Sequence, residues 1–256
     1  MSDPLTRFSN RVADYTRYRP GYPDAILDRL AVRLPEHPTV IDVGAGTGIF
    51  ADLMLQRGWT VHAVEPNAPM REACAQRLGG QSDLSIHDGT AEATGLPDSC
   101  ADLVVAAQAF HWFDSYSALR EFERLLRPDG FVALIWNNRQ TASTAFLVDY
   151  ENLLQEFATD YRKVNHQRFG DGRLESMLAD GFELIISPNI QSFDFEGLRG
   201  RLLSSSYAPA EGHVAHAPML RRLREIFDQH ARDSLVELLY TTELYIGRPV
   251  AGAGLG

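Results

Sequence analysis

The sequence of 256 residues contains little cysteine. Its two cysteines, Cys74 and Cys100, fit no metal-ligand or redox spacing, and no disulfide framework surrounds them, so we expect a reducing compartment. Long apolar runs are also absent: no stretch approaches the ~18 consecutive apolar residues that a membrane-spanning helix requires. Residues 1–20 lack the apolar centre of a secretory signal. We therefore expect a cytoplasmic protein without a membrane span.

Positive charge is in short supply. The chain has 24 Lys and Arg against 34 Asp and Glu, which gives a formal net charge of −10. Such a field repels a polyphosphate backbone, so nucleic acid is not an expected substrate. His213 and His216 are three residues apart, but no third ligand is evident, and we expect no metal. The sequence leaves the oligomeric state open.

Short apolar runs alternate with helical segments from Thr39 onward. This alternation is typical of βαβ units and predicts a parallel sheet. Helices are predicted at 49–58, at 67–79 with Asn67 as N-cap, and at 115–126, and Pro128 and Gly130 predict a turn over 127–130. The first five strands are expected at 39–43, 60–65, 84–88, 101–108 and 131–136.

The regular period ends after residue 137. A sixth strand is expected within 182–195, a helix over 217–232 and a last strand over 236–247. The predicted fold class is α/β, with a doubly wound, mostly parallel sheet of seven strands and an inserted helical lid. The predicted division is an N-terminal cap segment (1–38), a cofactor-binding core (39–137), an inserted lid (138–181) and a C-terminal completion of the sheet (182–256).

A glycine-rich turn follows the first predicted strand and opens a helix. Its glycines are Gly44, Gly46 and Gly48. Glycine permits positive φ and carries no Cβ, so a ligand can lie against the backbone at the carboxyl edge of the sheet. Glu65 ends the second strand 21 positions after Gly44, where its carboxylate can accept both hydroxyl protons of a ribose.

Two cofactor classes share this plan, and the spacing separates them. A dinucleotide fingerprint places its third glycine at position 49, but Ile49 stands there and the glycine is Gly48. Asp42 lies just before the turn, where it would repel a pyrophosphate and attract the ammonium of a methionine moiety. The pattern therefore favours S-adenosylmethionine over a nicotinamide or flavin dinucleotide.

The same residues carry a family resemblance. Asp-x-Gly-x-Gly-Thr-Gly from Asp42, with Glu65 after it, resembles the class I Rossmann-like S-adenosylmethionine-dependent methyltransferases. The segment 91–97 and the Phe110-His111-Trp112 box after the fourth strand resemble their small-molecule subgroup. Further similar segments are 18–23, 127–130, 136–138 and 204–207.

The resemblance implies a set of cofactor-binding residues. Those implied along the methionine and ribose are Asp42, Gly44, Ala45, Gly46, Thr47 and Glu65. Those implied on the two sides of the adenine are Pro66, Asn67 and Met70, and Thr90, Ala91 and Glu92. Those implied around the methionine tail are Gln108 and Ala109, with Tyr18 and Arg19 closing over it. Relatives often carry an acid where Thr90 stands, and Asp88 is the candidate substitute.

The function implied by the resemblance is methyl transfer to a small-molecule acceptor by direct in-line displacement, with S-adenosylhomocysteine as product. Such a displacement requires no catalytic residue, because holding the nucleophile near the methyl group in a dry site supplies most of the acceleration. His111 is the candidate general base, or else a histidine that shapes the pocket. Two other functions stay open: an adenosylmethionine-binding module or partner subunit without catalysis, and a nucleotide-dependent oxidoreductase.

Overall fold

The computed structural model describes residues 17–159, 161, 178 and 182–249. In this part of the chain seven strands form one sheet in the order β3-β2-β1-β4-β5-β7-β6. Only β7 runs against its neighbours, because it pairs antiparallel with both β5 and β6. The strands are β1 (Thr39–Val43), β2 (Thr60–Val64), β3 (Leu84–His87), β4 (Ala101–Ala107), β5 (Leu126–Arg139), β6 (Glu183–Phe193) and β7 (Val236–Gly247).

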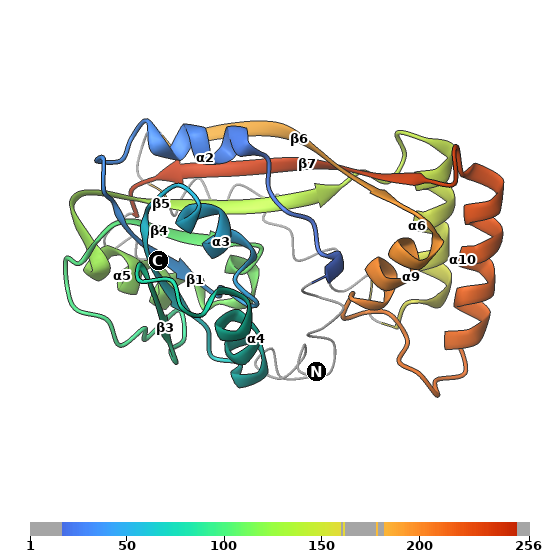
Figure 1. Cartoon of the computed structure of the whole chain (residues 1–256), viewed down its shortest axis with the longest axis horizontal. Helices are drawn as coiled ribbons and strands as arrows, with labels where there is room; N and C mark the ends of the chain where they lie inside the picture. The colour runs from blue at the N-terminus through green and yellow to red at the C-terminus, as the bar shows by residue number, and fades with distance from the viewer. Residues whose placement is uncertain (1–16, 160, 162–177, 179–181, 250–256) are drawn as a thin grey trace, which may run out of the picture.

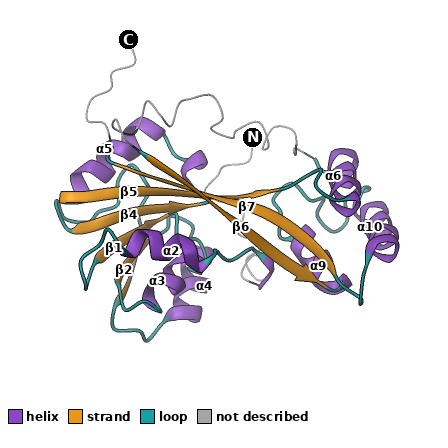
Figure 2. Ribbon diagram, turned by 90° about the horizontal axis from the view of Figure 1, so that it is seen from above, coloured by secondary structure: helices purple, strands orange, loops and turns teal. Residues whose placement is uncertain are grey.

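Helices cover both faces of this sheet, which confirms the doubly wound α/β class. One face carries α2 (Asp24–Ala31), α3 (Ile49–Leu55) and α4 (Ala68–Leu78), and the opposite face carries α5 (Ser115–Leu125) (Figure 2). The central strands read as continuous apolar runs because both of their faces are buried. In β4, for example, Leu103, Val104 and Val105 are all fully buried.

Polar side chains fix the starts of several helices. The Oδ1 atom of Asn67 accepts a hydrogen bond from the Met70 N–H at 3.1 Å, which confirms the predicted N-cap of α4. Asp114 caps α5 in the same way through the Ser117 N–H at 2.9 Å. These caps satisfy amide groups that have no partner within the helix, so each helix begins at a defined residue.

The strand β5 differs from its prediction at both ends. Residues 127–130 do not separate it from α5 as a free turn: Leu126 pairs with Ala101 and Phe131 pairs with Leu103, so the four residues between them form an irregularity within one strand. Pro128 cannot donate to the ladder, which explains the irregularity. At its other end β5 continues to Arg139 because β7 pairs with it as far as Tyr240.

A second lobe is built on the far ends of β6 and β7. The strands β6 and β7 stay paired to Phe193 opposite Val236, beyond the last residue of β5. There they support α6 (Ala145–Phe157), α9 (Phe195–Leu203) and α10 (His216–His230) (Figure 1). The apolar side chains of these elements form a separate core. We call this unit the second lobe, and the rest of the described chain the first lobe.

The predicted lid is described only in part. Its helix α6 packs with α10, which comes from the predicted C-terminal part of the chain. Residues 160, 162–177 and 179–181 of the lid, 1–16 of the cap segment and 250–256 lie outside the described residues. The division at residues 38, 137 and 181 stays a prediction. No helix in the described part of the chain is long and apolar enough to cross a membrane.

Candidate active site

A cavity of about 440 Å³ opens at the carboxyl ends of the central strands and extends to the second lobe. Its first-lobe wall comes from the residues that follow β1, β2 and β4. Its second-lobe wall includes residues at the end of β5, after α9 and in β7. The carboxyl edge of a doubly wound sheet is the usual place for a ligand, and the cavity lies there.

The cavity collects the predicted site residues with a single exception. All of them except Tyr18 are among its lining residues. The ring of Tyr18 lies against α9, where a Cβ on Gly200 would be 2.1 Å from its Cε2 atom. Asp88, the candidate substitute for an acid at position 90, does not line the cavity and forms an ion pair with Arg71 at 2.8 Å.

Two glycines of the turn between β1 and α3 have different structural roles. Gly48 has φ +78°, and a Cβ there would lie 2.7 Å from both Cys74 Sγ and Leu78 Cδ1, so this glycine lets α4 pack closely. Gly46 has φ +58°, and nothing lies within 4 Å of the position of its missing Cβ. Gly46 therefore keeps the backbone open to the cavity, as expected for a turn that a ligand approaches.

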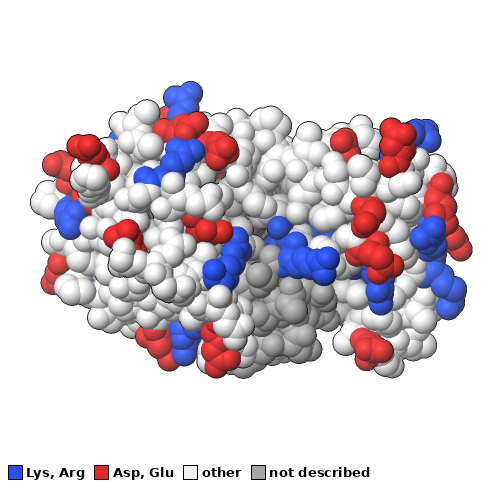
Figure 3. Space-filling model, in the orientation of Figure 1, with Lys and Arg blue, Asp and Glu red and all other residues white. Residues whose placement is uncertain are grey.

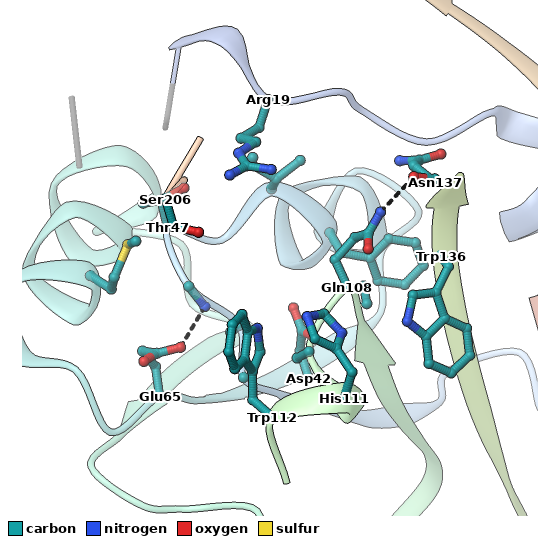
Figure 4. Close-up of a pocket in the computed structure, with 18 of the residues that line it drawn as sticks. Arg19, Asp42, Thr47, Glu65, Gln108, His111, Trp112, Trp136, Asn137 and Ser206 are labelled. Carbon is teal, nitrogen blue, oxygen red and sulfur yellow. Dashed lines mark hydrogen bonds between the residues drawn. The ribbon is translucent and has the colours of Figure 1, made fainter. Parts of the chain in front are cut away.

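The carboxylate of Glu65 is fixed by two backbone amides. Its Oε2 accepts from the Gly46 N–H at 2.9 Å (Figure 4), and its Oε1 accepts from the Asn67 N–H at 2.9 Å. Burial raises the pKa of Glu65, and the hydrogen bonds from Asn67 and Gly46 act in the opposite direction. Because each carboxylate oxygen has further acceptor capacity, the group can still bind two hydroxyls.

Two buried polar atoms on the same wall have no hydrogen-bond partner among the residues that the structure describes. They are Asp42 Oδ2 and Thr47 Oγ1, on side chains that are each 1 % exposed. Burial, followed by repulsion from Glu65, raises the pKa of Asp42 to about 7. A buried polar group without a partner costs about 1–3 kcal/mol, so both atoms are suited to receive polar groups of a ligand.

Hydrogen bonds hold the two segments that are predicted to flank the adenine. Arg71 donates to the carbonyl oxygens of Glu65 and Pro66 at 2.8 and 2.7 Å, which holds the start of α4 against the end of β2. Across the cavity, Glu92 Oε1 accepts from the Asp114 N–H at 2.9 Å. This contact joins the segment after β3 to the start of α5, and so fixes both sides of a slot.

The segment after β4 supplies the middle of the cavity. The backbone of Gln108 has φ +58°, and its Nε2 donates to the Asn137 carbonyl at 3.0 Å. His111, in the short helix η1 (Phe110–Trp112), and the indoles of Trp112 and Trp136 face the same space (Figure 4). Burial, and then the charge of Arg19, lower the pKa of His111 to about 4. Its imidazole is therefore neutral at physiological pH.

The second-lobe wall contains two arginines that the sequence analysis missed: Arg201, which is buried, and Arg139, which is partly buried. The Arg139 guanidinium contacts Glu151 Oε2 at 2.5 Å and Tyr161 Oη at 3.0 Å. Arg201, only 6 % exposed, donates to Tyr240 Oη at 3.2 Å and to Ser205 Oγ at 3.1 Å. Both arginines line the cavity together with Tyr161, Ser206, Tyr207 and Tyr240.

A weak signal for Arg201 was present in the sequence. It follows Leu198 by three residues and precedes Leu202, both of which are fully buried, so it occupies the apolar face of α9. A charge at an apolar helical position indicates a functional or paired group. Arg139 had no comparable local signal, because it lies at the end of a strand.

Comparisons with known proteins agree with this geometry. Residues 41–134 match the model of a methyltransferase domain family. An uncharacterized methyltransferase of Mycobacterium tuberculosis (strain H37Rv) is 39 % identical over 137 residues, which cover 54 % of each chain. One from Geobacillus thermodenitrificans is 30 % identical over 151 residues, 55 % of this chain and 68 % of that protein. The chain belongs to the class I Rossmann-like methyltransferases.

The likeness of this methyltransferase to solved structures is one of fold. A protein of Anaeromyxobacter dehalogenans assigned as a type II methyltransferase has a TM-score of 0.66 at 22 % identity, over 90 % of this chain and 98 % of that one. A phosphoethanolamine N-methyltransferase of Haemonchus contortus, solved with phosphomonomethylethanolamine and S-adenosylhomocysteine, has a TM-score of 0.53 at 13 % identity, over 96 % and 58 %. The match spans about half the length of the first curated relatives, so the activity of the whole protein is a matter for proposal.

Proposed function

We propose that this methyltransferase uses S-adenosylmethionine and transfers its methyl group to a small-molecule acceptor by direct in-line displacement. One observation carries the proposal: the clamped carboxylate of Glu65 lies on the same cavity wall as the unpartnered Asp42 Oδ2 and Thr47 Oγ1. Glu65 can accept hydrogen bonds from the two hydroxyls of a ribose, and the nearby buried carboxylate of Asp42 can bind an ammonium group. S-adenosylmethionine carries both groups. The residues present therefore suit adenosylmethionine.

The proposed contacts follow the layout of the cavity. Glu65 holds the ribose hydroxyls, and Asp42 attracts the ammonium, since two opposite charges interact strongly where water is excluded. The adenine lies between the segment at Pro66–Met70 and the segment at Thr90–Glu92, and Gln108 and Ala109 flank the methionine tail. Arg19 reaches the methionine carboxylate from the N-terminal segment. The closing role of Tyr18 stays a prediction.

The pocket residues supply position and a dry environment. When bound, the cofactor provides an electrophilic methyl group on a sulfonium. Trp112 and Trp136 present aromatic faces to the cavity, which attract a positive charge and exclude water. The chain then needs to hold the acceptor atom in line with the methyl group.

His111 is proposed as a positioning residue. A pKa of about 4 makes its imidazole a weak proton acceptor, whereas an efficient general base has a pKa near the working pH. Of the two roles that the sequence left open, the proposal takes the one in which the histidine shapes the pocket. We also propose a cytoplasmic location, because Cys74 and Cys100 are both free thiols.

Calorimetric titration with S-adenosylhomocysteine tests the proposal. The wild-type protein is expected to bind it, and Glu65→Ala is expected to raise the dissociation constant about 100-fold, because charge-assisted hydrogen bonds contribute about 1.5–3 kcal/mol each. Glu72→Gln, a change at an exposed residue of α4, is the matched control and should leave binding unchanged.

Three results would count against the proposal. Absence of S-adenosylhomocysteine binding by the wild-type protein would contradict the proposed use of S-adenosylmethionine. A nicotinamide dinucleotide that displaces it would favour an oxidoreductase. Tight binding without methyl transfer across a broad panel of acceptors would favour a binding module or partner subunit.

A further inference from the structure

Arg201 is a buried cation without a carboxylate partner in the described residues. Its side chain is 6 % exposed, and its contacts are the neutral hydroxyls of Tyr240 and Ser205. An arginine in a protein does not lose its proton, so the charge remains. Removing an unpaired guanidinium from water costs several kcal/mol.

The neighbouring Arg139 shows what a compensated cation looks like on the same wall. Its guanidinium is paired with Glu151, a residue of α6, and Tyr161 donates to the same carboxylate oxygen at 2.7 Å. The pair is neutral as a unit and structural in character. Arg201 therefore leaves one full positive charge on the second-lobe wall.

That charge faces the cavity on the side opposite the proposed cofactor contacts. Arg201 lines the cavity with Tyr207 and Tyr240, whereas Asp42 and Glu65 line it from the first lobe. On the surface, basic side chains lie near the middle of the molecule, between the two lobes (Figure 3). These charges attract an anion toward the cavity although the chain as a whole is acidic.

We propose that the methyl acceptor carries a carboxylate, and that this group binds the guanidinium of Arg201; the inference rests on the function proposed above. A carboxylate matches the charge, because one guanidinium leaves one positive charge to neutralise. It also matches the shape, because the planar guanidinium donates two parallel hydrogen bonds to a planar carboxylate. A phosphate dianion would call for a second available cation: Arg139 is already paired with Glu151, and Arg19, which also lines the cavity and donates to the Ser204 carbonyl at 3.1 Å, is assigned above to the methionine carboxylate.

The binding test uses three ligands of one shape: phenylacetate, its neutral counterpart phenylacetamide, and phenylphosphonate. Their affinities are measured by ligand-observed NMR on the full chain, with and without saturating S-adenosylhomocysteine. The wild-type protein is expected to bind phenylacetate about ten-fold more tightly than phenylacetamide. Arg201→Gln should lower the affinity for phenylacetate to the affinity for phenylacetamide. Arg201→Lys should restore part of the difference between the two affinities.

Two controls separate this inference from the function on which it rests. Arg222→Gln, at an exposed ion-paired arginine of α10, should leave every affinity unchanged. S-adenosylhomocysteine affinity, measured by calorimetry, should be the same in Arg201→Gln and wild type. If the wild-type protein fails to bind S-adenosylhomocysteine, the proposed function fails. The role of Arg201 is then still tested by whether the protein without S-adenosylhomocysteine binds phenylacetate more tightly than phenylacetamide.

Several outcomes would overturn the proposal. Equal binding of acid and amide, or no binding of either, removes the anion site. Tighter binding of phenylphosphonate assigns the site to a phosphate. A parallel loss of S-adenosylhomocysteine affinity in Arg201→Gln assigns the guanidinium to the cofactor carboxylate instead.

Discussion

The two walls of the cavity differ in charge and in origin. The first-lobe wall carries the buried carboxylates of Asp42 and Glu65, on segments that directly follow β1 and β2. The second-lobe wall carries the guanidinium groups of Arg139 and Arg201, at the end of β5 and in α9. One cavity thus has an acidic side suited to a cationic cofactor and a basic side suited to an anionic acceptor.

The two walls also differ in the groups that compensate their buried charges. Glu65 is held by backbone amides, which belong to the turn and the helix start whatever the ligand. Arg139 is held by a side chain from the helix α6, and Arg201, among the described residues, by neutral hydroxyls. The difference indicates that some charges stabilise the fold while others are kept for a ligand, and mutation can separate the two groups.

The largest effect on stability is expected at Arg139. Arg139→Met removes the cationic partner of Glu151 and leaves its hydrogen bond from Tyr161, so the cost in the free energy of unfolding is expected at the lower end of the range for a broken buried pair, about 3 kcal/mol. Arg201→Met should cost far less or even stabilise, because no carboxylate loses its partner. Urea unfolding at neutral pH measures both. The double variant Arg139→Met, Glu151→Met should recover much of the loss, and equal losses in the two single variants would contradict the comparison.

An intermediate effect, dependent on pH, is expected at Asp42. With a pKa of about 7 in the folded chain against 3.8 in an unfolded one, Asp42 takes up a proton on folding between these pH values. Its contribution to stability is therefore complete below pH 3.8, falls as the pH rises above that value and is lost once the pH has passed about 7. Asp42→Asn removes this loss, so at pH 8 the ligand-free variant should be about 2–4 kcal/mol more stable than wild type, and equal to it near pH 4.

The same variant should lose cofactor affinity. At pH 8 the ionised Asp42 of the wild type attracts the ammonium, so S-adenosylhomocysteine should bind more weakly to Asp42→Asn. Thermal unfolding and calorimetry across pH 4–9 measure both effects. Asp83→Asn, at an exposed position before β3, is the control. A stability difference independent of pH would show that Asp42 does not titrate as described.

The smallest effect is expected at His111, which lies between the two walls. Because its pKa is lowered to about 4, the profile of kcat/KM against pH should have no inflection near 6.5 from this residue. His111→Gln should lower kcat less than about ten-fold, since a general base contributes about 100-fold or more. Steady-state kinetics measure this, and a loss above 100-fold would restore the general-base role.

The first-lobe wall could be predicted because its signals are local. Asp42, the glycines of the turn and Glu65 fall within two consecutive βα units, and the geometry of such a unit fixes where its carboxyl-end residues lie. Asn67 capped α4 as its sequence indicated. Tyr18 marks the limit of this reasoning: it belongs to a segment before the first strand, and its ring packs against Gly200 of α9.

The second-lobe wall was decided mainly by tertiary structure. Tyr240 contacts Arg201 and stands opposite Arg139 because β7 inserts antiparallel between β5 and β6, and no local pattern states that register. The sequence by itself determined the first-lobe wall of the cavity, because spacing along the chain sets positions within a βα unit. The fold decided the charge on the second-lobe wall, because that charge depends on which distant side chains neutralise one another.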